Sequence, residues 1–175
     1  ISASSLGFKF NKTETEIQNI VSECSHKLLE ARSKREQPGK DDKVITSWNG
    51  LMISGFLAGY RITDDVNYFD IAKKSIDFFE KSFKKNNMLH RTFKNNNPKL
   101  NGYLDDYAYM ANASIDMFEN TSEPKYLEFA TNLANHLIIH FWDDSTDGFF
   151  FTSDSHEKLI IRPKNNYDLS TPSGN

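Results

Sequence analysis

Two adjacent aspartates offer the clearest chemistry in this sequence. Asp105 and Asp106 stand at the predicted start of a helix, within residues 104–108. Neighbouring carboxylates repel each other, which separates their pKa values, so that one can act as a general acid and the other as a base. The alternative is structural, because an acidic residue at a helix start caps the helix and complements its positive end. Both interpretations can hold together, since adjacent residues point in different directions.

A second polar and aromatic group, in residues 41–51, precedes another predicted helix. Trp48 could stack on the C–H face of a pyranose while Asn49 bonds the sugar hydroxyls, a division of labour expected of polar ligand pockets. Trp48 could equally be a core residue of the first helical turn. Asp42 belongs to a charge cluster that either faces solvent or contributes to substrate binding. Tyr107, which follows the paired aspartates, is a further predicted substrate-binding residue.

Two cations, Arg162 and Lys164, flank Pro163 after a predicted strand. Together they could form a clamp for an anion or a carboxylate, for which arginine offers a two-pronged geometry. The alternative is ordinary surface charge. Residues 171–175 are rich in turn-forming side chains and could begin a further helix.

The histidines and the single cysteine do not predict a metal site. His136 and His140 have the i, i+4 spacing of zinc ligands, but no Glu follows His136 as the metalloprotease pattern requires. Cys24 cannot form an internal disulfide, which fits a reducing cytosol, and it lies on an apolar helix stripe where we expect it to be buried and inert. We therefore expect no metal and no cofactor.

The composition limits the classes of function. The 175 residues are long enough for a domain with a real core, and the net charge of −3 argues against a nucleic-acid partner held by broad basic attraction. No apolar run approaches the ~18 residues of a membrane-spanning helix. No signal peptide is visible in the first residues, so a cytoplasmic protein is expected.

Hydrophobic spacing predicts a mainly helical chain. Thr13 and Glu16 form a capping-box pattern at the first long helix. Helices are expected over residues 13–35, 47–62, 67–85, 104–120 and 123–141. Short strands are expected over residues 88–94 and 148–152, the latter pairing with residues 159–162, and residues 95–98 are expected to form a loop.

The helices repeat along the chain. At an offset of 58 residues Tyr68 meets Tyr126, and Phe83 meets Phe141. Repetition at a period near 50 residues indicates an array of stacked units, here about 47–103 and 104–162. Helical hairpins of this length predict an all-α fold, a partial (α/α) toroid with short β-hairpins at one rim. Because a full toroid needs roughly 300 residues, we expect residues 1–175 to be a fragment of one such domain.

Three motifs, residues 41–52, 104–108 and 162–164 with 171–175, resemble the C-terminal portion of one family. It comprises thioredoxin-domain-containing proteins related to spermatogenesis-associated protein 20. The resemblance covers nearly the whole chain after residue 35. It implies an (α/α)6 toroid similar to N-acylglucosamine 2-epimerases and six-hairpin glycosidases. The family's thioredoxin-like domain and its cysteine motif are absent from this sequence, so no redox activity is expected of it.

The resemblance implies two functions of different class. The first is a carbohydrate-active toroid related to sugar epimerases or glycoside hydrolases, with Asp105 or Asp106 as acid/base and Trp48 and Asn49 holding the sugar. The second is a non-catalytic scaffold or binding domain that serves an attached redox module in the parent chain. An isolated fragment is expected to be inactive, and its open apolar edge is expected to promote self-association.

Overall fold

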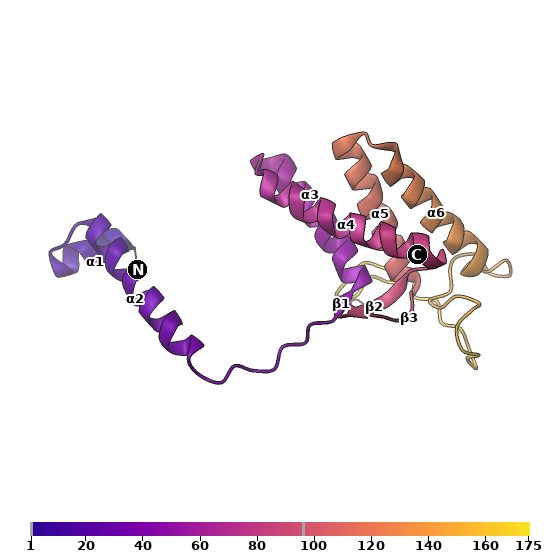
Figure 1. The fold of residues 1–175 in the computed structure, drawn as a ribbon, viewed down its shortest axis with the longest axis horizontal. Coiled ribbons are helices and arrows are strands. Elements are labelled where there is room, and N and C mark those ends of the chain that lie inside the picture. The colour runs from indigo at the N-terminus through magenta and orange to yellow at the C-terminus, as the bar shows by residue number, and fades with distance from the viewer. Residues whose placement is uncertain (1, 96) are drawn as a thin grey trace. The chain divides into compact units, whose positions relative to one another are not determined.

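The computed structural model describes residues 2–95 and 97–175, and the chain divides after Asp41 into two compact units. The first unit holds α1 (Ala3–Phe10) and α2 (Glu14–Ser33). The second unit holds, in order, β1 (Val44–Ile45), α3 (Thr46–Thr63), α4 (Val66–Asn86), β2 (His90–Lys94), β3 (Asn97–Asn101), α5 (Leu104–Thr121) and α6 (Pro124–His140) (Figure 1). The assignment of residues 1–175 to a single toroid domain stays a prediction.

The first unit is a short helical hairpin whose second helix begins where the sequence predicts. The Glu16 amide donates to the Thr13 hydroxyl (3.2 Å), and the Thr13 amide donates to the Glu16 carboxylate (2.7 Å). This is the predicted capping box. Ile17 is buried, but Cys24 is exposed, so the prediction of a buried cysteine is wrong. The reason is that α1 has only eight residues and is too short to cover the whole apolar stripe of α2.

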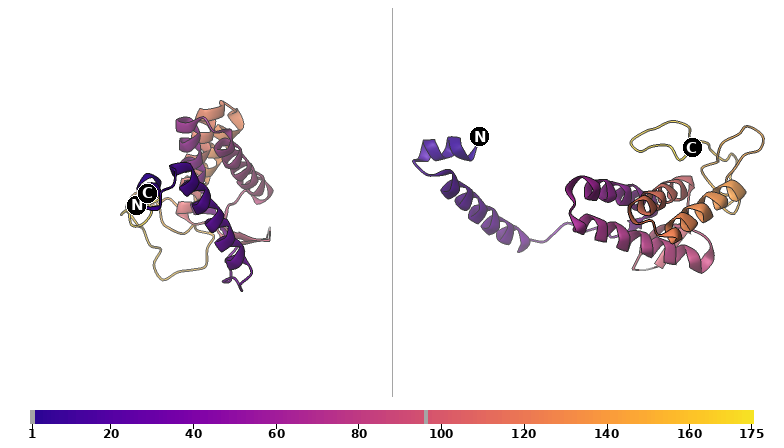
Figure 2. Two further views of the ribbon diagram at one scale, coloured as in Figure 1. Left: turned by 90° about the vertical axis from the view of Figure 1, so that its left-hand side faces the viewer. Right: turned by 90° about the horizontal axis from the view of Figure 1, so that it is seen from above.

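In the second unit α3 and α5 lie side by side and parallel, as the repeat predicts (Figure 2). The starts of α3 and α5, and likewise those of α4 and α6, are separated by the predicted 58 residues. The Ser47 amide, in the first turn of α3, donates to the carboxylate of Asp106 in the first turn of α5 (2.8 Å). The two helices therefore begin at the same rim, which confirms the expected arrangement.

The core of this unit lies between the two helical hairpins. Leu57 of α3 and Met110 of α5 are completely buried, as is Ile76 of α4. Four aromatic side chains fill the space around them and are almost fully buried: Phe79, Tyr107, Tyr126 and Phe141. None of the helices in the described part of the chain has the length and apolarity that crossing a membrane requires.

A three-stranded antiparallel sheet caps the rim at which α3 and α5 begin. β1 pairs with β2 (Val44 opposite Phe93), and β2 pairs with β3 (Thr92 opposite Lys99). The predicted strand over residues 88–94 is thus confirmed over residues 90–94. Of the loop that we expected over residues 95–98, the last two residues belong to β3, and residue 96 lies outside the described residues.

The hairpin predicted over residues 148–152 and 159–162 is absent from the described structure. Phe149 forms an isolated bridge with Trp142, and the Phe150 amide donates to the Phe141 carbonyl (2.8 Å). The Phe151 amide donates to the Pro163 carbonyl (2.8 Å). These backbone groups thus bond the end of α6 and a distant loop, and the segment runs on without helix or strand (Figure 1).

Close contact between α3 and α5 depends on Gly50. A Cβ atom at this position would lie 2.8 Å from the Tyr109 carbonyl carbon. We expect Gly50→Ala to lower the free energy of unfolding by about 1–3 kcal/mol, because the helices must move apart. Gly55→Ala is the matched control on the same helix, since nothing lies within 4 Å of its added methyl group.

Urea unfolding of both variants measures this difference. The control is expected to gain roughly 0.5–1 kcal/mol, the usual benefit of alanine over glycine in a helix. Equal behaviour of the two variants would show that α3 and α5 do not approach as closely as the structure indicates.

Candidate functional site

A cleft of about 470 Å³ runs between α3, α5 and the end of the chain. It is called the α3–α5 cleft below. Its lining combines apolar, hydroxyl, amide and carboxylate groups: Leu51, Ser54, Ala108, Tyr109, Asn112, Ile115, Asp116, Pro172, Ser173, Gly174 and Asn175. The several polar groups that converge on this cleft suit a ligand rich in hydroxyl groups.

Asp105 is not one of the residues that line this cleft, but its carboxylate lies close to Gly174, which does line it. Asp105 lies three, four and seven residues before Ala108, Tyr109 and Asn112, which places all four on the same face of α5. Its side chain is half-buried, and the Gly174 backbone lies close to its carboxylate. Burial raises the pKa of the Asp105 carboxyl, while the positive charge of Arg91 and the Gly174 amide act in the opposite direction. A carboxyl of this kind keeps its proton to a higher pH than a solvated aspartate does.

Asp106 has a different environment. It is completely buried, and its carboxylate accepts from the amides of Ser47 (2.8 Å) and Tyr103 (2.9 Å) and from Arg91 Nη1 (2.9 Å). Burial raises its pKa, and Arg91 and the two amides oppose that rise. Ile45, the residue before α3, provides no side-chain cap, so Asp106 caps α3 as well as its own helix. The capping alternative therefore describes Asp106, and Asp105 remains the candidate for acid–base chemistry.

Trp48 is exposed, with 58% of its surface accessible to solvent. The core alternative for this residue is therefore wrong, and its indole presents the open face that stacking on a sugar requires. Trp48 and Leu51, which lines the cleft, stand three residues apart on α3. Its role in substrate binding stays a prediction.

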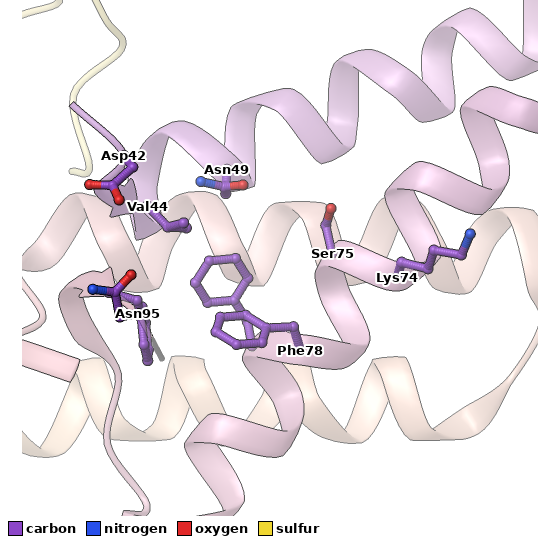
Figure 3. Close-up of a pocket in the computed structure, with 9 residues that line it drawn as sticks. Asp42, Val44, Asn49, Lys74, Ser75, Phe78 and Asn95 are labelled. Atoms are coloured by element: carbon purple, nitrogen blue, oxygen red, sulfur yellow. The ribbon is translucent and has the colours of Figure 1, made fainter. Parts of the chain in front are cut away.

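Asp42 and Asn49 line a second cavity, of about 390 Å³, beside the sheet (Figure 3). The Asn49 amide nitrogen donates to the Ile45 carbonyl (2.8 Å). Asp42 pairs with Lys94 (2.8 Å). Phe78 of α4 lines the same cavity, while the Lys74 side chain extends away from the other labelled residues (Figure 3). These two predicted residues thus lie at a different cavity from the one beside Asp105.

Tyr107 does not have the exposure that substrate binding requires. Only 1% of its surface is accessible, and its hydroxyl accepts from the Leu89 amide (3.0 Å). Its ring stacks on His136 with 4.6 Å between ring centres. The structure thus places Tyr107 in the core, because the residue after the paired aspartates faces inward on α5.

Arg162 and Lys164 are both engaged by the protein itself. Arg162 donates to the carbonyls of His140 and Thr152, at the end of α6 and in the loop beyond it. Lys164 pairs with Asp143 at 2.6 Å and holds the pKa of that carboxyl well below its usual range. These contacts bind the final loop to α6, which is a structural alternative to the predicted anion clamp.

Within residues 2–95 and 97–175, no group of three or more His, Cys, Asp or Glu side chains is arranged to hold a metal ion. His136 and His140 are neighbours, with 4.4 Å between ring centres. His140 Nδ1 lies 3.0 Å from the Asp154 carboxylate. The pair thus links α6 to the loop that follows it.

His136 makes stability depend on pH. Burial, helped by the charge of His140, lowers its pKa from 6.5 to about 4. Between these two values the unfolded chain binds more protons than the folded chain, so stability should fall as the pH is lowered from 6.5 to 4. We expect urea midpoints to fall less over this range in His136→Phe, which keeps a ring against Tyr107. An equal fall in wild type and variant would contradict the assignment.

Sequence reasoning missed Arg91, Tyr109 and Gly174. Arg91 lies in a strand and reaches both Asp106 and the Ser47 hydroxyl (2.8 Å). No local pattern marks such a residue, because its partners are distant in sequence. The repeat did offer a signal for Tyr109, since the 58-residue offset aligns it with Leu51, and both line the cleft.

Comparison with known proteins identifies the family. The model of glycosyl hydrolase family 76 matches residues 13–149, which is more than half of the chain. The chain belongs to glycosyl hydrolase family 76. This membership agrees with the six-hairpin glycosidase-like fold that the three motifs implied.

Curated relatives are longer than this chain. An uncharacterized protein of Caenorhabditis elegans is 28% identical over 165 residues, covering 90% of this chain and 22% of the relative. Human spermatogenesis-associated protein 20 is 26% identical over 170 residues, covering 91% and 22%. Its mouse counterpart is 29% identical over 172 residues, covering 91% and 22%. The predicted resemblance is confirmed, and the chain spans about a fifth of the length of these relatives.

Solved structures show the same fold. A family 76 glycoside hydrolase from a bovine Bacteroides thetaiotaomicron strain aligns with a TM-score of 0.56 at 22% identity, covering 65% of this chain and 24% of that one. An α-mannanase of Bacteroides thetaiotaomicron aligns at 0.55 and 16% identity, covering 66% and 32%. An α-amylase from Clostridium perfringens aligns at 0.52 and 16% identity, covering 66% and 32%. The prediction of a mainly helical (α/α) toroid fold is confirmed.

Proposed function

We propose that this chain forms part of a carbohydrate-active toroid in which the α3–α5 cleft binds an α-linked glycan. The observation that carries this proposal is the half-buried carboxyl of Asp105, which lies close to Gly174 and shares a helix face with the cleft residues Tyr109 and Asn112. The printed names of two solved relatives, an α-mannanase and an α-amylase, support the choice of an α-linked glycan.

In this proposal Asp105 exchanges a proton with the glycosidic oxygen. Burial raises the pKa of this carboxyl, which is the direction that favours a general acid. Asn112 and Ser54 bond sugar hydroxyls, and Trp48 supplies an aromatic face above Leu51. Nearby Arg91 supplies positive charge that favours the carboxylate once the proton has left.

Glycoside hydrolysis uses two carboxyl groups, roughly 5 to 10 Å apart. Asp116 also lines the cleft, but it lies eleven residues beyond Asp105 on the same helix, roughly 16 Å along its axis. It is therefore too far away to be the second member of the pair. Under the proposal the second carboxyl comes from another part of the parent protein, and the isolated chain binds sugar without turning it over.

Binding of α-linked oligosaccharides to the isolated chain tests this proposal. Titration followed by amide NMR is expected to perturb Tyr109, Asn112 and Ser54, with affinity in the millimolar range. Trp48→Ala should weaken binding, whereas Trp142→Ala is the matched control at the other tryptophan. A folded chain whose cleft signals do not move with any α-linked glycan would contradict the proposal.

The alternative is a non-catalytic scaffold or binding domain attached to a redox module in the parent chain. The chain covers only 22% of the human relative, which leaves most of that protein for other domains and so supports this alternative. Turnover in the full protein distinguishes the two functions, since both allow sugar binding.

A further inference from the structure

Two side chains fix residues 172–175 to loops that are distant in the sequence. Asn175 Oδ1 accepts from the Phe149 amide (2.7 Å), and its Nδ2 donates to the carbonyls of Phe149 (3.0 Å) and Asn165 (3.2 Å). The Ser173 hydroxyl donates to the same Asn165 carbonyl (2.6 Å). Residues 172–175, called the strap below, are therefore anchored through the side chains of Ser173 and Asn175.

Between these two anchors Gly174 meets Asp105. The Gly174 backbone lies very close to the Asp105 carboxylate. A Cβ atom at Gly174 would lie 2.8 Å from Asp105 Oδ1 and 2.7 Å from Leu104 Cγ. Only glycine therefore lets the strap backbone come this close to the carboxylate without displacing it.

The strap also contacts the cleft wall, because the Tyr109 hydroxyl donates to the Pro172 carbonyl. The strap thus lies against Asp105 through Gly174 and also lines the cleft. Other charged and titratable groups nearby are Arg91 from β2, Asp106 and Tyr109 from α5, and Asp168, whose charge acts on Tyr109.

We propose that the strap orients the Asp105 carboxylate toward the α3–α5 cleft, and that Asn175 is the positioning residue that holds the strap in place. This inference rests on the proposed acid–base role of Asp105. Asn175 does not touch the carboxylate and acts through Gly174. The close approach of Gly174 restricts how the carboxylate can turn, and so favours one orientation for the substrate.

The Gly174 amide proton reports this contact directly. The NMR signal of a backbone amide beside a carboxylate shifts when that carboxylate ionises, so in the wild-type chain the Gly174 signal should follow the titration of Asp105. The same transition should be absent in Asp105→Asn. It should be lost in Asn175→Ala and retained in Asn135→Ala, a matched control on the exposed side of α6.

Gly174→Ala tests the same contact from the other side, because its methyl group pushes the strap from Asp105 while leaving Asn175 intact. In the full protein both strap variants are expected to lower kcat by about 10- to 100-fold with little change in KM, as misplacement of a catalytic group does. An unchanged Gly174 titration in Asn175→Ala would overturn the positioning role. Loss of glycan binding by the wild-type chain would instead count against the proposed function, so the two failures are distinguishable.

Discussion

Asp106→Ala is expected to lower the free energy of unfolding by about 3–5 kcal/mol, the usual effect of removing one partner of a buried ion pair. The carboxylate is completely buried and satisfies two amides and Arg91. Its removal leaves the Ser47 and Tyr103 amides without their acceptor. Urea unfolding followed by circular dichroism measures the loss.

Two further variants keep this prediction testable. Asp106→Asn retains an acceptor oxygen and should lose less stability than the alanine variant. Glu119→Ala, at an exposed position of the same helix, should change stability by no more than about 0.5 kcal/mol. If Asp106→Ala were as stable as Glu119→Ala, the buried hydrogen-bonded cluster would not exist in solution.

The largest expected effect on activity belongs to Asp105. In the full protein, Asp105→Asn should lower kcat on an α-linked glycan by about 10²–10⁴-fold, the usual contribution of general acid–base catalysis. Substrate binding should change little, because asparagine has nearly the same shape. A general acid works only while it is protonated, so the loss of the Asp105 proton produces the alkaline limb of the pH–rate profile. Asparagine has no such proton to lose, so this limb should be absent in the variant.

Glu119→Gln is the matched control for this measurement, because it removes an exposed carboxylate from the same helix. The kcat values of the two variants should therefore differ by about 10²–10⁴-fold. An Asp105→Asn enzyme that turns over like the control would exclude Asp105 from the chemistry. A full protein that binds glycan without turnover would favour the scaffold alternative.

The helices could be predicted because their signals are local. Thr13 and Glu16 mark the start of α2 by themselves, and the aligned pair Tyr68 and Tyr126 reveals the repeat that places α4 and α6. The parallel arrangement of α3 and α5 followed from the same offset. The repeat in the sequence therefore predicted both the helices and which of them lie side by side.

The final loop could not be predicted in this way. Residues 148–152 contain three aromatic residues, which favours a strand, but their backbone partners are Phe141 and Pro163. The structural role of Asp106 could not be predicted for a related reason, because Arg91 and Ser47 approach it only in the folded chain. Long-range contacts of single side chains leave no pattern in a sequence.

The cap that Asp106 provides for α3 couples the two repeats during folding. The first turn of α3 has no side-chain cap of its own and borrows a carboxylate from the following unit. In an array of stacked units, such an interface term makes neighbours unfold together. The Ser47 amide should therefore exchange its hydrogen only when α5 opens, and its exchange rate reports the cooperativity between one hairpin and the next.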